Sequence, residues 1–179
     1  MSPLPSSGEP RRGVAGAVGG VVLAAAIAVA PAVFAGAGAA EEPTGFAGLP
    51  WGTAAPAVRE ALKARCQFKE PPDAFKQVCP GYTIGNIPGQ LTLLFVPGYG
   101  LSGWDFSCQP DRAGALSAQV TERFGRAVRD GASRAYWHWP WGSASLYKRE
   151  CSVSVATNTA MDHIRQMERE RARRQKRDF

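Results

Sequence analysis

An uncharged run from Gly13 to Ala40 constrains this chain more than any other feature of its sequence. Arg11 and Arg12 stand just before the run, and the acidic residues Glu41 and Glu42 follow it. This is the charge order of an export signal, because the basic end stays in the cytoplasm while the apolar segment enters the membrane. We therefore expect the remainder to fold outside the cytoplasm, as one domain, since it is too short for two well-buried cores.

The end of the uncharged run offers a cleavage site. An A-x-A pattern ends at Ala39, so cleavage there or one residue later would start the mature protein near Glu41. An uncleaved anchor is the alternative, because the run exceeds the roughly 20 apolar residues that span a bilayer. Its many Ala and Gly residues, with Pro31 among them, favour cleavage. We interpret residues 1–40 as a signal peptide or N-terminal membrane segment. The rest is then periplasmic or outside the cell, and membrane-anchored if this segment is uncleaved.

Four cysteines follow in the exported part, at Cys66, Cys79, Cys108 and Cys151. An even number in an oxidising compartment predicts two disulfides, for which three pairings are possible. Their order along the chain favours Cys66 with Cys79 and Cys108 with Cys151. Buried free thiols are the alternative, and the spacings do not fit a zinc site. We expect no metal and no cofactor.

Charge is unevenly distributed along the chain. Residues 41–160 contain 12 basic and 10 acidic side chains, whereas residues 161–179 contain 7 basic and 4 acidic ones. The nearly neutral part is interpreted as the exported domain, and the last part as a charged helix or tail. A neutral domain argues against nucleic acid as a partner. The basic tail could contact anionic lipid, although a solvated helix end is the ordinary interpretation of such a charge run.

Two helices are predicted within the domain. The first is capped by Thr53, carries Val58 and Leu62 on one face and ends near Cys66. The second covers about residues 112–124. Its apolar stripe spaced by four residues is Leu116, Val120 and Phe124, and Gly125 follows at the position of a left-handed cap.

Strands account for most of the remaining domain. A loop is expected from Gln67 to Pro80, because it holds two adjacent prolines. Strands are expected at about 82–87, 91–96, 104–108, 135–141, 143–149 and 151–156, with a turn at 97–100. Strands joined by short turns pair antiparallel, and one-sided helices need a sheet to cover. The predicted fold is α+β, a two-layer sandwich of about five antiparallel strands covered by two helices, with a charged helix at the C-terminus.

Residues 136–141 read Tyr-Trp-His-Trp-Pro-Trp and form the sharpest local pattern. In a strand, Trp137, Trp139 and Trp141 project from one face, and Tyr136 and His138 from the other. If the helices cover the first face, the tryptophans are core, which is the ordinary role of large aromatics in a small domain. If it is open to solvent, they form an apolar patch able to stack on sugars or anchor a protein. These three tryptophans and Tyr136 are the candidate binding residues.

Several short motifs occur together between residues 46 and 155. They are an opening F-x-G-x-x-W-G loop with Phe46, Gly48, Trp51 and Gly52; a helix with Val58 and Leu62; strand residues Leu94, Phe95 and Leu101; a helix with Leu116 that ends in Phe124 and Gly125; and a strand with Trp137 or Trp139. In combination they resemble a widespread type of small bacterial exported domain. Such domains resemble in outline the β-lactamase inhibitor protein and the SmpA/OmlA outer-membrane assembly lipoprotein. This chain lacks the lipidated cysteine of the latter. The resemblance implies a role in binding or envelope maintenance.

No catalytic set is evident in the sequence. His138 has no nucleophile placed near it by spacing, and Ser143 and Ser145 lack a G-x-S-x-G context. We therefore expect an exported, non-catalytic domain that binds an envelope protein or glycan. The alternatives are a hydrolase or transferase acting on envelope material, and a membrane-tethered structural module.

Overall fold

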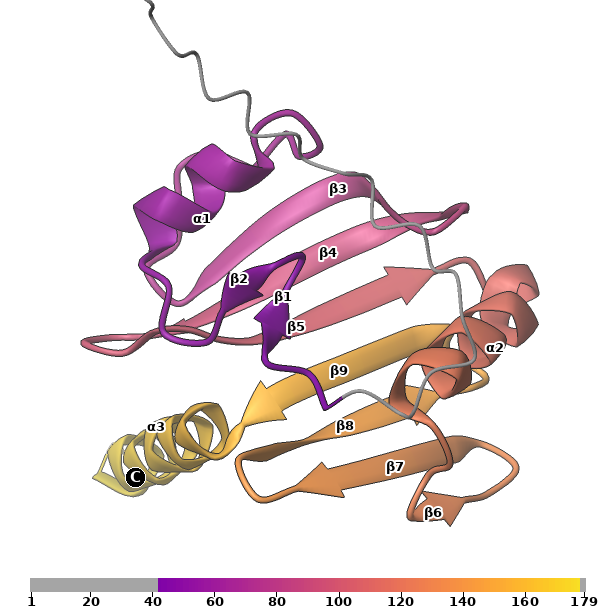
Figure 1. Ribbon diagram of the computed structural model, residues 1–179. Coiled ribbons are helices and arrows are strands. Elements are labelled where there is room, and N and C mark those ends of the chain that lie inside the picture. The colour runs from indigo at the N-terminus through magenta and orange to yellow at the C-terminus, as the bar shows by residue number, and fades with distance from the viewer. Residues whose placement is uncertain (1–41, 178–179) are drawn as a thin grey trace, which may run out of the picture. The chain divides into compact units, whose positions relative to one another are not determined.

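The computed structural model describes residues 42–177 (Figure 1). The expected signal peptide at 1–40 lies outside these residues. In chain order the elements are β1 Gly45–Phe46, β2 Leu49–Pro50, α1 Ala55–Leu62, β3 Lys76–Ile84, β4 Ile87–Val96, β5 Gly100–Cys108, a 3-10 turn Pro110–Arg112, α2 Ala113–Phe124, β6 Arg129–Asp130, β7 Arg134–Trp139, β8 Gly142–Tyr147, β9 Ser152–Thr157 and α3 Asn158–Arg177.

Seven strands form one antiparallel sheet in the order β3-β4-β5-β9-β8-β7-β6, and β1 and β2 form a separate two-stranded sheet. The predicted α+β class with an antiparallel sheet is confirmed. The expected number of about five strands is wrong. The main sheet also contains the two-residue strand β6, and β3 begins six residues before the strand expected at Tyr82.

The start of β3 lies inside the segment expected to be a loop. Asp73 Oδ1 accepts hydrogen bonds from the backbone N–H groups of Phe75 at 2.6 Å and Lys76 at 3.1 Å. These bonds lower the pKa of the Asp73 carboxyl group, because they favour its ionised form. The turn they hold directs the chain into β3, so the extended strand begins at Lys76 and pairs with β4.

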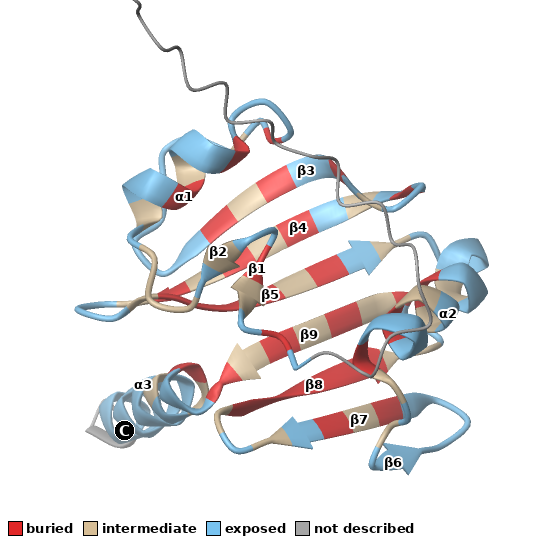
Figure 2. Cartoon of the chain, viewed as in Figure 1, coloured by how far each residue is buried: buried red, intermediate tan, exposed pale blue. Residues whose placement is uncertain are grey.

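One face of the sheet carries the hydrophobic core, and we call it the core face. Its two central rows across the strands are Cys79, Leu91, Phe106, Val153, Leu146 and Ala135, and Gln77, Leu93, Trp104, Val155, Ala144 and Trp137. Figure 2 shows the resulting alternation of buried and more exposed residues along the strands. In Figure 1, α1, α2 and the β1-β2 hairpin lie in front of this sheet. The predicted layer of two helices on a sheet is present.

The two helices bury the expected side chains, but one cap differs from its prediction. Val58 and Leu62 of α1 are buried, as is the α2 stripe of Leu116, Val120 and Phe124. Thr53 does not cap α1. Its hydroxyl donates to Pro50 O at 2.7 Å, and Ala54 occupies the capping position without a side-chain hydrogen bond. The helix ends at Leu62, four residues before Cys66.

Both favoured disulfides are present. Cys66 and Cys79 join the segment after α1 to β3, with sulfur atoms 2.07 Å apart. Cys108 and Cys151 join the end of β5 to the start of β9, with sulfur atoms 2.01 Å apart. Two disulfides are typical of a protein that folds in an oxidising compartment.

Two glycines allow close backbone contacts at the margins of the sheet. Gly100 has φ +102°, and a Cβ there would lie 2.3 Å from Gly52 O. The opening loop can therefore pair with β5, where Gly52 N–H donates to Leu101 O at 2.8 Å. At Gly142, which begins β8, a Cβ would lie 2.3 Å from Ala156 O. Glycine is required where these segments meet, because any side chain would clash with backbone.

The charged C-terminal helix is present as α3. It follows β9 directly and contacts β4, β5 and β9. Ala160 is buried, whereas the residues from Ile164 onward whose side chains are described are exposed. Within residues 42–177, no helix is both long and apolar enough to cross a bilayer.

Candidate binding surfaces

The tryptophan row lies on the core face beside α2. Trp137 is 3% exposed, whereas Trp139 and Trp141 are half-buried. Phe124 makes edge contacts with Trp137 and Trp139, at centroid distances of 5.8 and 5.5 Å. Trp139 and Trp141 stack at 5.4 Å with an interplanar angle of 3°, and Trp51 lies 5.5 Å from Trp141. The row runs from the core toward the surface, so only its outer two indoles reach solvent.

The buried end of this row is held by a hydrogen bond as well as by packing. Trp137 Nε1 donates to the backbone O of Gly125 at 2.9 Å. Gly125 ends α2 with φ +69°, and its N–H donates to Thr121 O at 2.8 Å. The φ of Gly125 is positive, as a left-handed cap requires, but its ψ of −157° lies outside the left-handed helical region. Trp137 thus fixes the exit of α2 against β7, which is a structural role.

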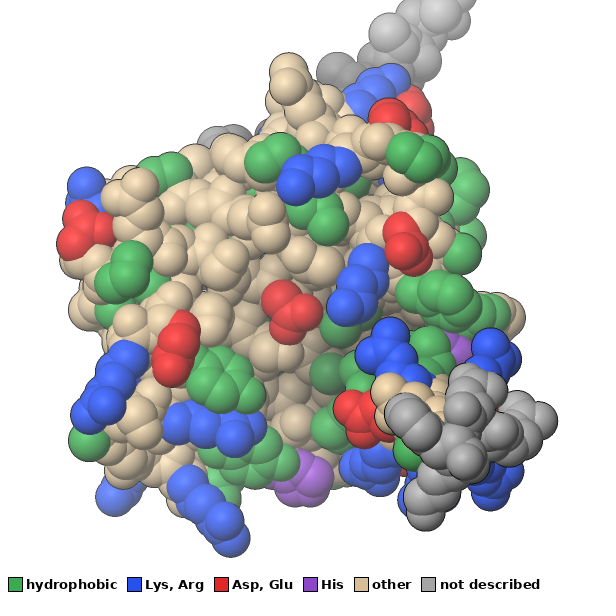
Figure 3. All heavy atoms as spheres, turned by 180° about the vertical axis from the view of Figure 1, so that it is seen from behind, with side chains coloured by type: hydrophobic (Ala, Val, Ile, Leu, Met, Phe, Trp, Pro, Cys, Tyr) green, Lys and Arg blue, Asp and Glu red, His purple; other side chains and the backbone are tan. Residues whose placement is uncertain are grey.

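The opposite face of the sheet has a different composition, and we call it the polar sheet face. Its three rows across the strands are Gln90, Ser107, Ser152, Tyr147 and Arg134; Thr92, Asp105, Ser154, Ser145 and Tyr136; and Leu94, Gly103, Ala156, Ser143 and His138. Figure 3 views the molecule from this side, and the middle of the surface is mostly backbone and uncharged polar side chains. Of the helices in residues 42–177, none lies across its middle (Figures 1 and 3). Helix α3 borders it, where Ser143 Oγ donates to Met161 Sδ at 3.6 Å.

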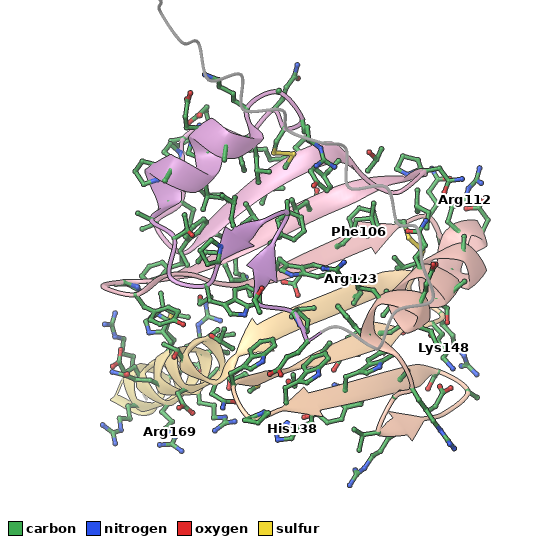
Figure 4. The ribbon with its side chains drawn as sticks, viewed as in Figure 1. Phe106, Arg112, Arg123, His138, Lys148 and Arg169 are labelled. Atoms are coloured by element: carbon green, nitrogen blue, oxygen red, sulfur yellow. A yellow bond between two sulfur atoms is a disulfide. The ribbon has the colours of Figure 1, made fainter. Side chains whose placement is uncertain are left out.

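Aromatic and cationic side chains gather at the β7-β8 side of the polar sheet face. The Arg134 guanidinium lies 4.8 Å from the centroid of the Tyr147 ring, and its Nη2 donates to Ser145 Oγ at 2.6 Å. Tyr136 and His138 stack with centroids 6.3 Å apart. Figure 4 shows His138 at the outer margin of the sheet. These side chains offer ring faces, hydroxyl groups and one cation to a partner.

Asp105 lies in the middle row of the same face and is half-buried. Burial raises the pKa of its carboxyl group, and this effect outweighs the hydrogen bond donated by Ser154 and the field of Lys76, which lower it. The charged form is therefore less stable here than in solvent. A carboxylate kept at such a position in the centre of an open surface is a candidate recognition group, because perturbed acids concentrate at functional sites.

The geometry does not assemble a nucleophile and a base. His138 Nδ1 lies 3.5 Å from the Tyr136 hydroxyl, and Ser143, which faces His138 across the β7-β8 pair, donates to Met161 instead. A nucleophilic serine needs a hydrogen bond to its base. Over residues 42–177 there is also no group of three or more His, Cys, Asp or Glu side chains that could hold a metal ion.

The structure separates the four predicted binding residues. Trp137, Trp139 and Trp141 lie on the core face, and Tyr136 lies on the polar sheet face. The residues missed from the sequence are Arg134 and Tyr147 and the serines between them and β5. A signal for them existed in the alternation of Ser143 with Ser145 and Ser152 with Ser154, which predicts one open face on two adjacent strands. Comparison of the chain with models of protein families, with curated proteins and with solved structures found no match.

Proposed function

We propose that this is an exported, non-catalytic domain that binds another component of the cell envelope, a protein or a glycan, through its polar sheet face. The single observation that supports the proposal most strongly is a wide sheet surface whose middle is not crossed by any helix of the described residues. Antiparallel sheets can leave one face solvated, but this one also gathers aromatic, guanidinium and half-buried carboxylate groups. Such groups are typical of recognition surfaces.

The two disulfides support the location. One ties the segment after α1 to β3 and the other joins the end of β5 to the start of β9, and bridges of this kind persist in oxidising compartments. Ser107 is exposed and Ser152 and Ser154 are half-buried, so a partner that lies close to β5 and β9 can hydrogen bond to their hydroxyl groups, whereas Ser143 and Ser145 of β8 are buried. The half-buried Trp139 and Trp141 are a second, smaller contact area on the other face.

Capture from an envelope extract tests the proposal. Wild-type domain is compared with a Tyr136→Ala, Tyr147→Ala variant, and Tyr99→Ala serves as the matched control because Tyr99 is 41% exposed on the β4-β5 turn. We expect a captured component to be lost with the double variant and retained with the control, while near-ultraviolet circular dichroism shows all three folded.

Further arms of the experiment separate the alternatives. A Trp139→Ala, Trp141→Ala variant reports on the smaller contact area. Treating the extract with a protease or with a wall-degrading enzyme before capture distinguishes a protein from a glycan partner. Equal recovery of every component by wild type and the tyrosine double variant would contradict the proposed surface. Turnover of cell-wall or ester substrates by the purified domain would favour an enzyme.

A further inference from the structure

An open cleft of about 570 Å³ lies between α1 and the loop closed by the Cys66–Cys79 disulfide. Its lining includes Arg59, Glu60, Lys63, Phe68, Glu70 and Gln77. Arg59 and Glu60 come from α1 and Lys63 directly follows it, Phe68 and Glu70 come from the loop, and Gln77 comes from the core-face side of β3. The cleft is therefore distinct from the polar sheet face.

Two polar atoms of the cleft lining are buried without a hydrogen-bond partner among the described residues. They are Arg59 Nη1, a donor, and Gln77 Oε1, an acceptor. Gln77 is 5% exposed, so its side chain is almost wholly removed from solvent. An unpaired buried group of this kind destabilises the fold, and an incoming ligand that pairs with it recovers the lost interaction.

Other contacts of the Arg59 side chain hold it in place, while its buried Nη1 is left without a hydrogen-bond partner. Its other terminal nitrogen, Nη2, forms an ion pair with Glu70, and its guanidinium lies 4.9 Å from the centroid of the Phe68 ring. The disulfide fixes the loop that supplies both partners. The orientation of the free donor is thus set before any ligand binds, which lowers the entropic cost of binding.

The charged and apolar side chains that line the cleft limit the kind of ligand that can bind there. Arg59 pairs with Glu70 and Lys63 pairs with Glu60, so the two cations and two anions offset one another. A charged ligand gains little from such a site. Ala55, Pro56, Phe68 and Pro72 supply apolar wall. The ligand that fits is neutral, with one acceptor, one donor and an apolar group beside them.

We propose that this cleft binds a peptide-type amide that carries an apolar side chain. The amide C=O accepts from Arg59 Nη1, the amide N–H donates to Gln77 Oε1, and the apolar group packs on Phe68. The inference goes beyond the proposed function, since it concerns another site and another ligand.

Titration of the full domain with N-methylisovaleramide, followed by ¹⁵N-edited nuclear magnetic resonance, tests the proposal. This probe has one amide donor, one amide acceptor and a branched apolar group. Its N,N-dimethyl analogue lacks the donor. We expect saturable shifts at Arg59, Phe68 and Gln77 with the first compound, and about three- to tenfold weaker binding of the second, as the loss of one hydrogen bond implies.

Two variants test whether Arg59 Nη1 and Gln77 Oε1, the two unpaired atoms, cause the difference in binding between the compounds. Gln77→Met removes the acceptor at similar volume, and we expect it to bind both compounds equally. Arg59→Lys keeps the positive charge but removes the guanidinium, and we expect weaker binding of both compounds. Arg134→Lys, on the polar sheet face, is the matched control and should behave as wild type. Linear shifts without saturation, equal binding of both compounds by wild type, or discrimination retained by Gln77→Met would each overturn the proposal.

Discussion

Two polar side chains occupy buried or half-buried sheet positions at which an apolar residue would fit. Gln77 stands in a core-face row beside Leu93, and Asp105 stands in the centre of the polar sheet face between Thr92 and Ser154. The Gln77 acceptor has no partner, and the Asp105 carboxylate is only partly compensated. Each of these side chains lowers the free energy of unfolding of the unbound domain. Both are therefore positions at which a group useful for binding reduces stability.

Replacing Asp105 by Asn should make stability less dependent on pH. Because burial raises the pKa of Asp105, the native state binds its proton more tightly than the unfolded state does. Stability of the wild type therefore falls as pH rises from the ordinary aspartate range through the raised native pKa, and Asn removes this loss. We expect the variant to be more stable than wild type at neutral pH, with the difference vanishing in strong acid. Urea unfolding across the acid range measures it, and a constant difference at every pH would contradict the assignment.

Replacing Gln77 by Met should stabilise the unliganded domain. The substitution removes an unpaired buried acceptor and fills the same space with an apolar chain. We expect the free energy of unfolding to rise by about 1 kcal/mol. Chemical denaturation monitored by tryptophan fluorescence measures the change. A loss of stability would mean that the amide has a structural partner, and would argue against the cleft as a ligand site.

At the level of single elements, helix α2 and strand β7 are joined on the core face by aromatic contacts and by a hydrogen bond. Phe124 closes the helix against Trp137 and Trp139, while Gly125 accepts the hydrogen bond of the Trp137 indole. Helix, cap and strand thus depend on one another. This interdependence buries Trp137 beside α2, while Trp139 and Trp141 stay partly open to solvent.

Removing the Phe124 ring should therefore destabilise the domain strongly. Phe124 is 7% exposed, and we expect Phe124→Ala to lower the free energy of unfolding by about 3 to 5 kcal/mol, because it leaves a cavity beside two indoles. Val128, four residues later, is 67% exposed. Val128→Ala is the control and should stay within about 0.5 kcal/mol of wild type. Thermal unfolding of both variants gives the comparison, and equal effects would contradict the packing described.

The elements that could be predicted from the sequence are those defined by local periodicity. The spacing of Leu116, Val120 and Phe124 identifies a helix and its buried face without tertiary information. The start of β3 could not be predicted in this way, because it depends on the backbone hydrogen bonds of Asp73. Similarly, alternation shows that Trp137 and Trp139 share a face, but only the position of α2 shows that this face is covered.

The candidate surfaces were less accessible to prediction than the fold. The serines of β8 and β9 alternate visibly in the sequence, yet the contact of Ser154 with Asp105 requires the crossover that places β9 beside β5. The cleft is even harder to predict from the sequence, because Arg59 and Gln77 are far apart in the chain and no local pattern links them. The contacts between distant residues that could be predicted were the two disulfides, because the even number of cysteines and their order along the chain indicated both pairs.

Across the whole molecule, the two disulfides close loops of different size. Cys66 and Cys79 are 13 residues apart, and Cys108 and Cys151 are 43 apart. The second bridge spans α2 and the strands β6 to β8, and it joins the two central strands β5 and β9 at one end. It therefore connects the two halves of the sheet.

Removal of each bridge should lower stability in the order of loop size. The chain-entropy relation gives about 4 kcal/mol for Cys108–Cys151 and about 3 kcal/mol for Cys66–Cys79. We expect the Cys108→Ala, Cys151→Ala variant to unfold at lower urea than the Cys66→Ala, Cys79→Ala variant, and both to unfold below wild type. The reverse order would show that strain or residual structure, and not loop length, decides the contribution.

The two edges of the seven-stranded sheet are built in a way that hinders aggregation through edge-strand pairing. Along β3, Pro80 carries no N–H, the register shifts beside it, and Val78 O already accepts Lys69 N–H at 2.9 Å. At the opposite margin, the short strand β6 pairs with β7 at Ala135 and Tyr136. Over the described residues neither margin presents a long unbroken row of backbone groups. Neighbouring copies of the protein therefore lack a template on which one chain could extend the sheet of another.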